Sequence, residues 1–342
     1  MTDETPRATA GAPASQLGVA VSVVIPAHND ARNLVRLLTA LTRELPRAVS
    51  GEIIVVANGC RDDSVAVCHR FDVVCLERPP LAPAAARNAG AALARGRWLA
   101  FLDADTEPGQ AWFDGLAELV GGRSGEGSEI AGWPCLAPAG AGWVAQAWQH
   151  VRFAPSRLPG TLDCGNLIIS RRLFDEIGGF NANRIAGEDV ELCESAIAHG
   201  HRPRFDARLV VFHYGEPAGL GQFFSRELFH ADPLATVLHN CRRSIVDLSI
   251  LLLVVFGVTG FLGLVAAGLT GDFRFALPAA GALTILTVAA LAKAAIKWTG
   301  TVRLGDFLRM VFLCQVMLTA RALGTLIRRQ MWRSAPPGTL QA

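Results

Sequence analysis

The chain has 342 residues, a formal net charge of +2 and hydrophobic residues at 51% of its positions. This length allows one large domain or two smaller ones, and the near-neutral charge gives no reason to expect a nucleic-acid partner. The eight cysteines include no Cys-x-x-Cys pair and no His-Cys metal spacing, which excludes the usual zinc-site patterns and favours small buried apolar residues. The composition changes near residue 244, where long uncharged stretches replace a mixed sequence.

The first 18 residues are rich in Ala, Pro, Thr and Gly, so we expect a disordered tail and no signal peptide. Strand-like and helix-like runs alternate from there to residue 102. The predicted strands cover 19–25, 52–56, 71–76 and 98–102, and the predicted helices follow Asn29 and Asp30, start near residue 64, and cover 84–94. This alternation predicts an α/β fold with a mostly parallel sheet covered on both faces. The phosphate-binding fingerprints of dehydrogenases and P-loop proteins are absent from the sequence.

Two aspartates, Asp103 and Asp105, follow the apolar run 98–102, and Thr-Glu-Pro-Gly then turns the chain. Open α/β sheets bind ligands at the carboxyl ends of their strands, and hard oxygen ligands suit Mg²⁺ or Mn²⁺ carrying a phosphate. Aspartates are also common as plain turn residues, so the pair alone leaves both interpretations open.

A series of short segments occupies about residues 19–230 in a fixed order: VSVVIPAHND (21–30), IIVVANGCRD (53–62), ARNAG (86–90), FLDAD (101–105), CGNLIISRRLF (164–174), IGGFN (177–181), GEDVELC (187–193) and VFHYG (211–215). In this order they resemble the family 2 inverting glycosyltransferases of the GT-A fold. The resemblance implies a Rossmann-like mixed sheet of the nucleotide-diphospho-sugar transferase type. It also implies an enzyme that takes a sugar from a nucleotide donor.

The resemblance implies a metal site that carries the donor diphosphate, with Mg²⁺ or Mn²⁺ as the cofactor. Asp105 would bind the metal directly, and Asp103 would lie near the ribose or the metal's water shell. His213, at the end of the apolar strand 209–212, would complete the shell or contact the diphosphate. A single histidine at a strand end can equally be structural.

The adjacent acids Glu188 and Asp189 precede a run with helical spacing. Acids at a helix start can simply complement the helix dipole. The resemblance instead favours Asp189 as the general base that deprotonates the acceptor hydroxyl, with Glu188 as a supporting residue or alternative base. Direct attack by the acceptor would invert the anomeric configuration.

The donor site is predicted from residues at the ends of the first strands and helices. Arg87 and Asn88 belong to a helix whose amino end should face the same crevice, and an arginine fork suits phosphate oxygens. Pro26, Ala27 and Asn29 are expected to shape the floor of the base pocket.

The sequence departs from the family pattern after the second strand, where an Asp is usual and Ala57 is followed by Asn58. The nucleobase of the donor would then be recognised by Asn58 or by backbone groups, and a uridine donor becomes less certain. The same departure allows an inactive domain.

Two uncharged runs, 248–269 and 275–292, each approach the roughly 20 residues that cross a bilayer, and Gly271-Asp272 turns the chain between them. They predict a transmembrane hairpin. The basic residues outside both ends place those ends, and the catalytic domain, in the cytoplasm: Arg242, Arg243, Lys293, Lys297 and Arg303. We therefore expect a multi-pass protein of the inner (cytoplasmic) membrane, divided into 1–18 (tail), 19–240 (catalytic domain), 241–298 (hairpin) and 299–342 (third helix and basic tail).

A third apolar run, 307–327, carries Arg309, Gln315 and Arg321, so we favour an interfacial helix over a third crossing. The segment 219–230 has an amphipathic pattern, which fits an interfacial helix or packing against the sheet equally well.

Together these features predict a membrane-anchored, metal-dependent inverting glycosyltransferase. The membrane suggests a lipid-linked glycan or glycolipid acceptor, as in cell-envelope polysaccharide assembly. An alternative is a polyprenyl-phosphate glycosyltransferase, although its ionised acceptor needs no base and Glu188-Asp189 counts against it. A non-catalytic, nucleotide-binding membrane scaffold is the alternative of a different class.

Overall fold

The computed structural model describes residues 18–122, 128–153, 160–182, 187–232, 234–242, 244–297 and 303–334. The chain divides into two compact units. Unit 1 comprises residues 1–135 and 161–211, and unit 2 comprises 136–160 and 212–342. The predicted tail lies outside the described residues except for Gly18. The predicted limits at 240 and 298 follow composition, and they stay predictions.

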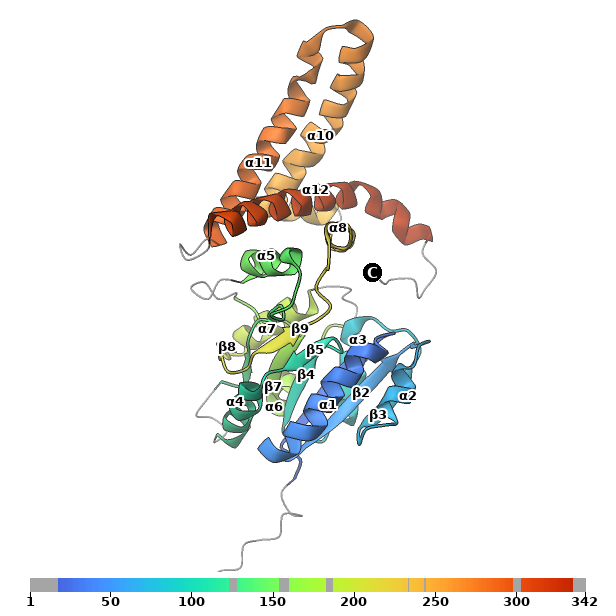
Figure 1. Cartoon of the computed structure of the whole chain (residues 1–342), viewed down its shortest axis with the longest axis vertical. Coiled ribbons are helices and arrows are strands. Elements are labelled where there is room, and N and C mark those ends of the chain that lie inside the picture. The colour runs from blue at the N-terminus through green and yellow to red at the C-terminus, as the bar shows by residue number, and fades with distance from the viewer. Residues whose placement is uncertain are drawn as a thin grey trace, which may run out of the picture. The chain divides into compact units, whose positions relative to one another are not determined.

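Unit 1 is built on a seven-stranded sheet of order β3-β2-β1-β4-β7-β6-β8 (Figure 1). β1 pairs in parallel with β2 and β4, and β2 pairs in parallel with β3, whereas β7 is antiparallel to both β4 and β6. The sheet is therefore mixed, as the family resemblance implied. The strands are β1 (Val21–Ala27), β2 (Gly51–Asn58), β3 (Val74–Arg78), β4 (Trp98–Leu102), β6 (Ile130–Gly132), β7 (Asn166–Ser170) and β8 (Arg204–Phe205).

Helices cover both faces of this sheet because alternate strand residues are buried on opposite sides. Val23 and Ile25 share one buried cluster with the leucines of α1 and with Trp112 of α4. Val24 and Phe101 belong to a second cluster with residues of α3, α6 and α7. The helices of unit 1 are α1 (Ala31–Ala48), α2 (Ser64–Cys68), α3 (Pro83–Leu93), α4 (Gln110–Gly121), α6 (Arg171–Ile177) and α7 (Glu188–Ala198).

One predicted strand differs from the structure, and one predicted helix has a capping partner that the sequence did not indicate. The third strand begins at Val74 instead of residue 71, because the N–H of Val73 donates to the carbonyl of Phe71 and bends the chain there. Helix α1 begins after Asp30 as predicted, but the carboxylate of Asp62 accepts the hydrogen bond from the Ala31 N–H, at 3.0 Å. The loop after β2 thus supplies the cap.

Unit 2 is helical. Side chains from α5, α8, α10 and α12, among them Trp148, Phe223, Ile250 and Met317, form a common buried cluster. The strand β9 (Val211–His213) begins with the last residue of unit 1. The helices are α5 (Trp143–Arg152), α8 (Leu220–Phe229), α9 (Leu234–Asn240), α10 (Ile245–Thr270), the 3-10 turn η2 (Phe273–Ala276), α11 (Leu277–Lys297) and α12 (Leu304–Ser334).

Three helical segments of unit 2 are long and apolar enough to cross a membrane: Val246–Thr270, Phe273–Ile296 and Leu304–Ile327. These segments indicate membrane association. The 26 residues of α10 extend about 39 Å, more than a hydrocarbon core of about 30 Å. α10 and α11 form an antiparallel pair, and α12 runs across them near the end where α10 begins and α11 ends (Figure 1). Close packing requires a glycine here, because a Cβ on Gly260 would lie 2.8 Å from the Cα of Ala279.

Candidate functional site

The two aspartates of the predicted metal site lie at the carboxyl end of β4, the central strand of the sheet in unit 1. The backbone turns directly after them, since the Thr106 N–H donates to the Asp103 carbonyl at 3.1 Å and β5 (Thr106–Pro108) begins there. A carboxylate oxygen of Asp103 lies within 4.8 Å of one of Asp105. Neighbouring carboxylate oxygens are hard ligands of the kind that Mg²⁺ and Mn²⁺ prefer, so the chemistry of the pair fits such an ion.

Arg87 joins this strand end to the start of α7. Its Nη2 donates to Oδ1 of Asp103 at 2.7 Å, and its Nη1 donates to Oε1 of Glu188 at 2.8 Å. Arg87 is only 5% exposed, so both ion pairs are largely screened from water. A guanidinium forked between two carboxylates fixes the distance between the DxD segment and the acidic helix start.

Asp189, the neighbour of Glu188, is in a different electrostatic environment. Burial, followed by the negative charge of Asp163, raises the pKa of Asp189 from 3.8 to about 6. Its Oδ1 accepts the N–H of Val190 at 2.8 Å, a bond that lowers the pKa without cancelling the rise. Asp189 is therefore ionised at neutral pH and more basic than an ordinary aspartate, as a general base should be.

Asp163 brings a further carboxylate to this region through the turn before β7. Its Oδ1 accepts the N–H of Gly165 at 2.9 Å. A Cβ at position 165 would stand 3.0 Å from Oδ2 of Asp103, so a glycine lets this turn approach the aspartate. Asp163 was not among the residues predicted for the site, although it directly precedes the segment CGNLIISRRLF (164–174).

The residues predicted to form the base pocket cluster at the carboxyl ends of β1 and β2. The Asn29 backbone has a φ of 49°, and its side chain accepts the Arg61 N–H through Oδ1 at 2.7 Å. His28, which sequence reasoning passed over, contacts the Asn58 carbonyl through Nδ1 and the Asn29 amide through Nε2. Pro26 and Ala27 end β1 beside this pair.

Asn58 and Asn88 are each held by backbone groups at both ends of their amides. Asn58 donates to the Leu81 carbonyl at 3.0 Å and accepts the Leu81 N–H at 2.7 Å. Asn88 makes the same two-way contact with Phe180, at 2.7 and 3.0 Å. Both side chains therefore fix loops around the site, and donor contacts by them stay predictions.

His213 belongs to unit 2, where it lines a cavity of about 520 Å³. Its Nδ1 lies 3.5 Å from Oε1 of Glu216, a carboxylate that is almost fully buried. Arg152 and Arg226 donate to the two oxygens of Glu216 at 2.7 and 2.9 Å. The metal role of His213 stays a prediction.

Residues 22–122 match the model of the family described as Glycosyl transferase family 2. Over these residues the chain is similar to family 2 glycosyltransferases. The resemblance seen in the sequence is thereby confirmed, and the match and its relatives support a glycosyltransferase enzyme.

Two named glycosyltransferases are similar to this chain over an overlapping part of it. It is 26% identical to Glycosyltransferase AglE of Haloferax volcanii over 211 residues, which are 58% of this chain and 68% of that protein. It is 29% identical to the pre-mycofactocin glycosyltransferase of Mycobacterium tuberculosis over 236 residues, 63% of this chain and 47% of the relative. The chain thus spans about half the length of the second relative.

A solved structure resembles this chain over nearly its whole length. The mannosyltransferase PcManGT from Pyrobaculum calidifontis, in complex with GDP-Man and Mn²⁺, matches with a TM-score of 0.57 at 17% identity. The match covers 93% of this chain and 90% of that chain. It confirms the GT-A fold followed by apolar C-terminal helices.

Proposed function

We propose that the protein is a membrane-anchored, metal-dependent inverting glycosyltransferase that moves a sugar from a nucleotide donor to a hydroxyl of a membrane-associated glycan or lipid. The observation that carries the proposal is the contrast between Glu188 and Asp189. The carboxylate of Glu188 forms an ion pair with Arg87, whereas burial raises the pKa of Asp189 to about 6. An active site needs such a base, whereas a scaffold that only binds nucleotide does not.

In the proposed reaction the acceptor oxygen attacks the anomeric carbon while the bond to the diphosphate breaks. The hydroxyl proton goes to Asp189, and the nucleoside diphosphate leaves with its electron pair. Attack opposite to the leaving group inverts the anomeric carbon. Glu188 keeps Arg87 in place, and Arg87 in turn fixes Asp103 for the donor.

Asp103 and Asp105 would hold the divalent cation, with His213 as the proposed third ligand. The ion, when bound, supplies positive charge that stabilises the departing diphosphate. Support comes from the carboxylate pair itself and from PcManGT, which was solved with GDP-Man and Mn²⁺. Arg87, Asn88, Asn58 and the turn at Pro26, Ala27 and Asn29 would surround the donor.

The acceptor is proposed to be membrane-associated because the apolar helices follow the catalytic domain in one chain. We propose that α10 and α11 cross the cytoplasmic membrane and that α12 lies along its inner surface. Spanning helices tilt by only about 0–40° from the bilayer normal, whereas α12 runs across the hairpin in Figure 1. We propose that the catalytic domain lies on the cytoplasmic side, which the basic flanks of the hairpin support.

The test is transfer by the full chain from a panel of nucleotide sugars to lipid extracts. Asp189→Asn should lower turnover by about 10²–10⁴-fold and leave donor affinity within about twofold, because the base faces the acceptor. Turnover near wild type would favour an acceptor that arrives ionised, such as a polyprenyl phosphate. Nucleotide binding by the wild type without any transfer would support the scaffold.

A further inference from the structure

The helices α10 and α11, together with Leu318 of α12, line a pocket that contains none of the residues proposed for the donor, the metal or the base. Its volume is about 320 Å³, at the lower end of the range of about 300–1,000 Å³ for small-ligand sites. Most of its lining is aliphatic, and one side chain carries a charge. The lining residues are Val246, Ser249, Leu252, Thr284, Ile285, Val288, Ala289, Ala292, Lys293 and Leu318.

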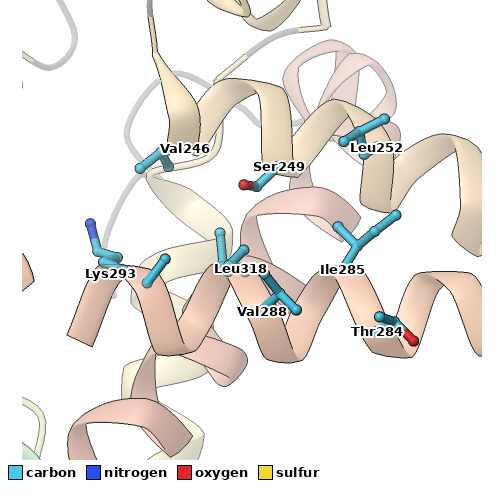
Figure 2. A pocket seen from close by; sticks show the side chains of 10 residues that line it. Val246, Ser249, Leu252, Thr284, Ile285, Val288, Lys293 and Leu318 are labelled. Carbon is cyan, nitrogen blue, oxygen red and sulfur yellow. The ribbon is translucent and has the colours of Figure 1, made fainter. Parts of the chain in front are cut away.

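The pocket runs along the axis of the hairpin. Figure 2 shows Val246, Ser249 and Leu252 of α10 facing Ile285 and Val288 of α11, with Lys293 at the end beside Val246. From Thr284 to Lys293 the helix rises about 14 Å, which matches a stretch of extended hydrocarbon chain. A lipid tail in a bilayer has this same direction.

The pocket opens toward the surroundings of the hairpin, because Val288 at its edge is 60% exposed and Thr284 is exposed as well. The hydroxyl of Thr284 already donates to the Ala280 carbonyl of its own helix at 3.0 Å. Around a membrane-spanning pair this opening faces hydrocarbon, so an apolar chain fits the pocket and water does not.

Lys293 is the charged residue of the pocket lining, and its position indicates which head group a bound lipid would have. It lies three residues before Ile296, the end of the candidate span, which is about 4.5 Å along the helix. A lysine at this depth extends its ammonium to the headgroup level. Lipid phosphates lie at this level, and a positive charge beside an apolar pocket complements a lipid with a negative head.

We propose that this pocket binds one hydrocarbon chain of a lipid whose anionic phosphate head contacts Lys293. The proposal depends on the membrane embedding of α10 and α11 and not on sugar transfer. It places a lipid site in unit 2, separate from the donor site in unit 1.

The experiment is native mass spectrometry of the full, delipidated chain in detergent, without any sugar donor. The probes are phosphatidylglycerol and phosphatidylcholine with identical oleoyl chains, so only the head differs. We expect one lipid per chain and about fivefold tighter binding of phosphatidylglycerol, the factor that one lysine near an anionic membrane surface supplies.

Two variants test the two parts of the pocket. Lys293→Gln should remove the preference for phosphatidylglycerol and keep binding of phosphatidylcholine, with Arg303→Gln as the matched charge control. Val288→Trp should fill the pocket and weaken both lipids, with Leu283→Trp as the control, since Leu283 is 64% exposed on the same helix and does not line the pocket.

Equal binding of both lipids by the wild type would overturn the assignment of the head. Unchanged lipid binding by Val288→Trp would overturn the assignment of the pocket. A chain dimer that Val288→Trp dissociates, with no lipid retained, would assign the pocket to a second copy and also overturn the proposal. Loss of transfer activity leaves these measurements unaffected, so the two proposals fail separately.

Discussion

Replacing Asp189 by Asn should make the folded protein more stable while it removes the base. At neutral pH the wild type must ionise a carboxyl whose pKa is raised from 3.8 to about 6 by burial and by the charge of Asp163. This difference corresponds to about 3 kcal/mol, at about 1.4 kcal/mol for each tenfold change in the protonation equilibrium. Asn has the same shape and can still accept the Val190 N–H. It carries no charge, so it avoids the penalty.

The sign and the pH window follow from linkage. A folded-state pKa above the unfolded value means that the folded protein binds the proton more tightly, so the penalty is absent below about pH 4. The penalty grows between about pH 4 and pH 6 and is constant above that. The expected gain of the Asn variant is therefore about 3 kcal/mol at pH 7.5 and about 1.6 kcal/mol at pH 5.

The assay is thermal unfolding of the full chain in detergent, followed by intrinsic fluorescence at both pH values. At pH 7.5 the Tm of the transition that reports unit 1 should rise by about 6–12 °C, and at pH 5 by about half as much. Glu188→Gln is the matched control, because it loses a charge-assisted hydrogen bond to Arg87 and should be less stable by about 1.5–3 kcal/mol.

The Asp189→Asn and Glu188→Gln variants should therefore change the free energy of unfolding in opposite directions. A lower Tm for Asp189→Asn at pH 7.5, or a gain that is the same at both pH values, would refute the reasoning. The carboxyl would then be either favourably paired or fully solvated. Neither environment would produce a base with a pKa near 6.

Three further predictions concern the metal, the Arg87 fork and unit 2. EDTA should abolish transfer, and added Mn²⁺ or Mg²⁺ should restore it. The Asp105→Asn variant should stay inactive with added metal while its Tm is unchanged. Full activity in EDTA would contradict the metal assignment. Arg87→Met removes the positive charge that lowers the pKa of Asp189, so the acid limb of the pH–rate profile should move above pH 6 and stability should fall by about 3–5 kcal/mol. An acid limb that does not move would show that Arg87 does not affect the pKa of the base. In unit 2, Arg321 binds Glu227 at 2.9 Å, and Glu227 is 2% exposed. Arg321→Met should therefore lower the Tm, and the double variant with Glu227→Leu should regain most of the lost stability. An additive loss in the double variant would refute this pairing.

The central strands and their turns were predictable because local pattern determines them. The strand 98–102 was predicted with the bounds that β4 has, since a short apolar run ended by acids and Pro-Gly fits only a buried strand end. The strands β6 and β8 have three and two residues, too few to show any periodicity. β6 pairs with β7 and β8 pairs with β6, so the places of both strands follow from β7, whose antiparallel direction is set by tertiary packing.

The roles of charged side chains were harder to predict, because their partners lie far apart in the sequence. Arg87 was expected to contact the donor phosphates, and that role stays a prediction. In the structure its guanidinium binds Asp103, 16 residues away, and Glu188, 101 residues away. No local pattern contains such a pairing, because only the folded chain brings α3, the end of β4 and the start of α7 together.

The different roles of Glu188 and Asp189 could not be predicted from the sequence, because the two are consecutive acids in the first turn of one helix. Both acids lie in the first turn of α7 and experience the same helix dipole, so the dipole does not distinguish them. Their surroundings separate them: Arg87 compensates the charge of Glu188, while burial beside Asp163 penalises the charge of Asp189. Pairs of carboxyl groups whose environments push their pKa values apart are a general way of making one group structural and the other reactive. The proposed base is therefore specified by the fork and the Asp163 turn, which lie outside its own motif.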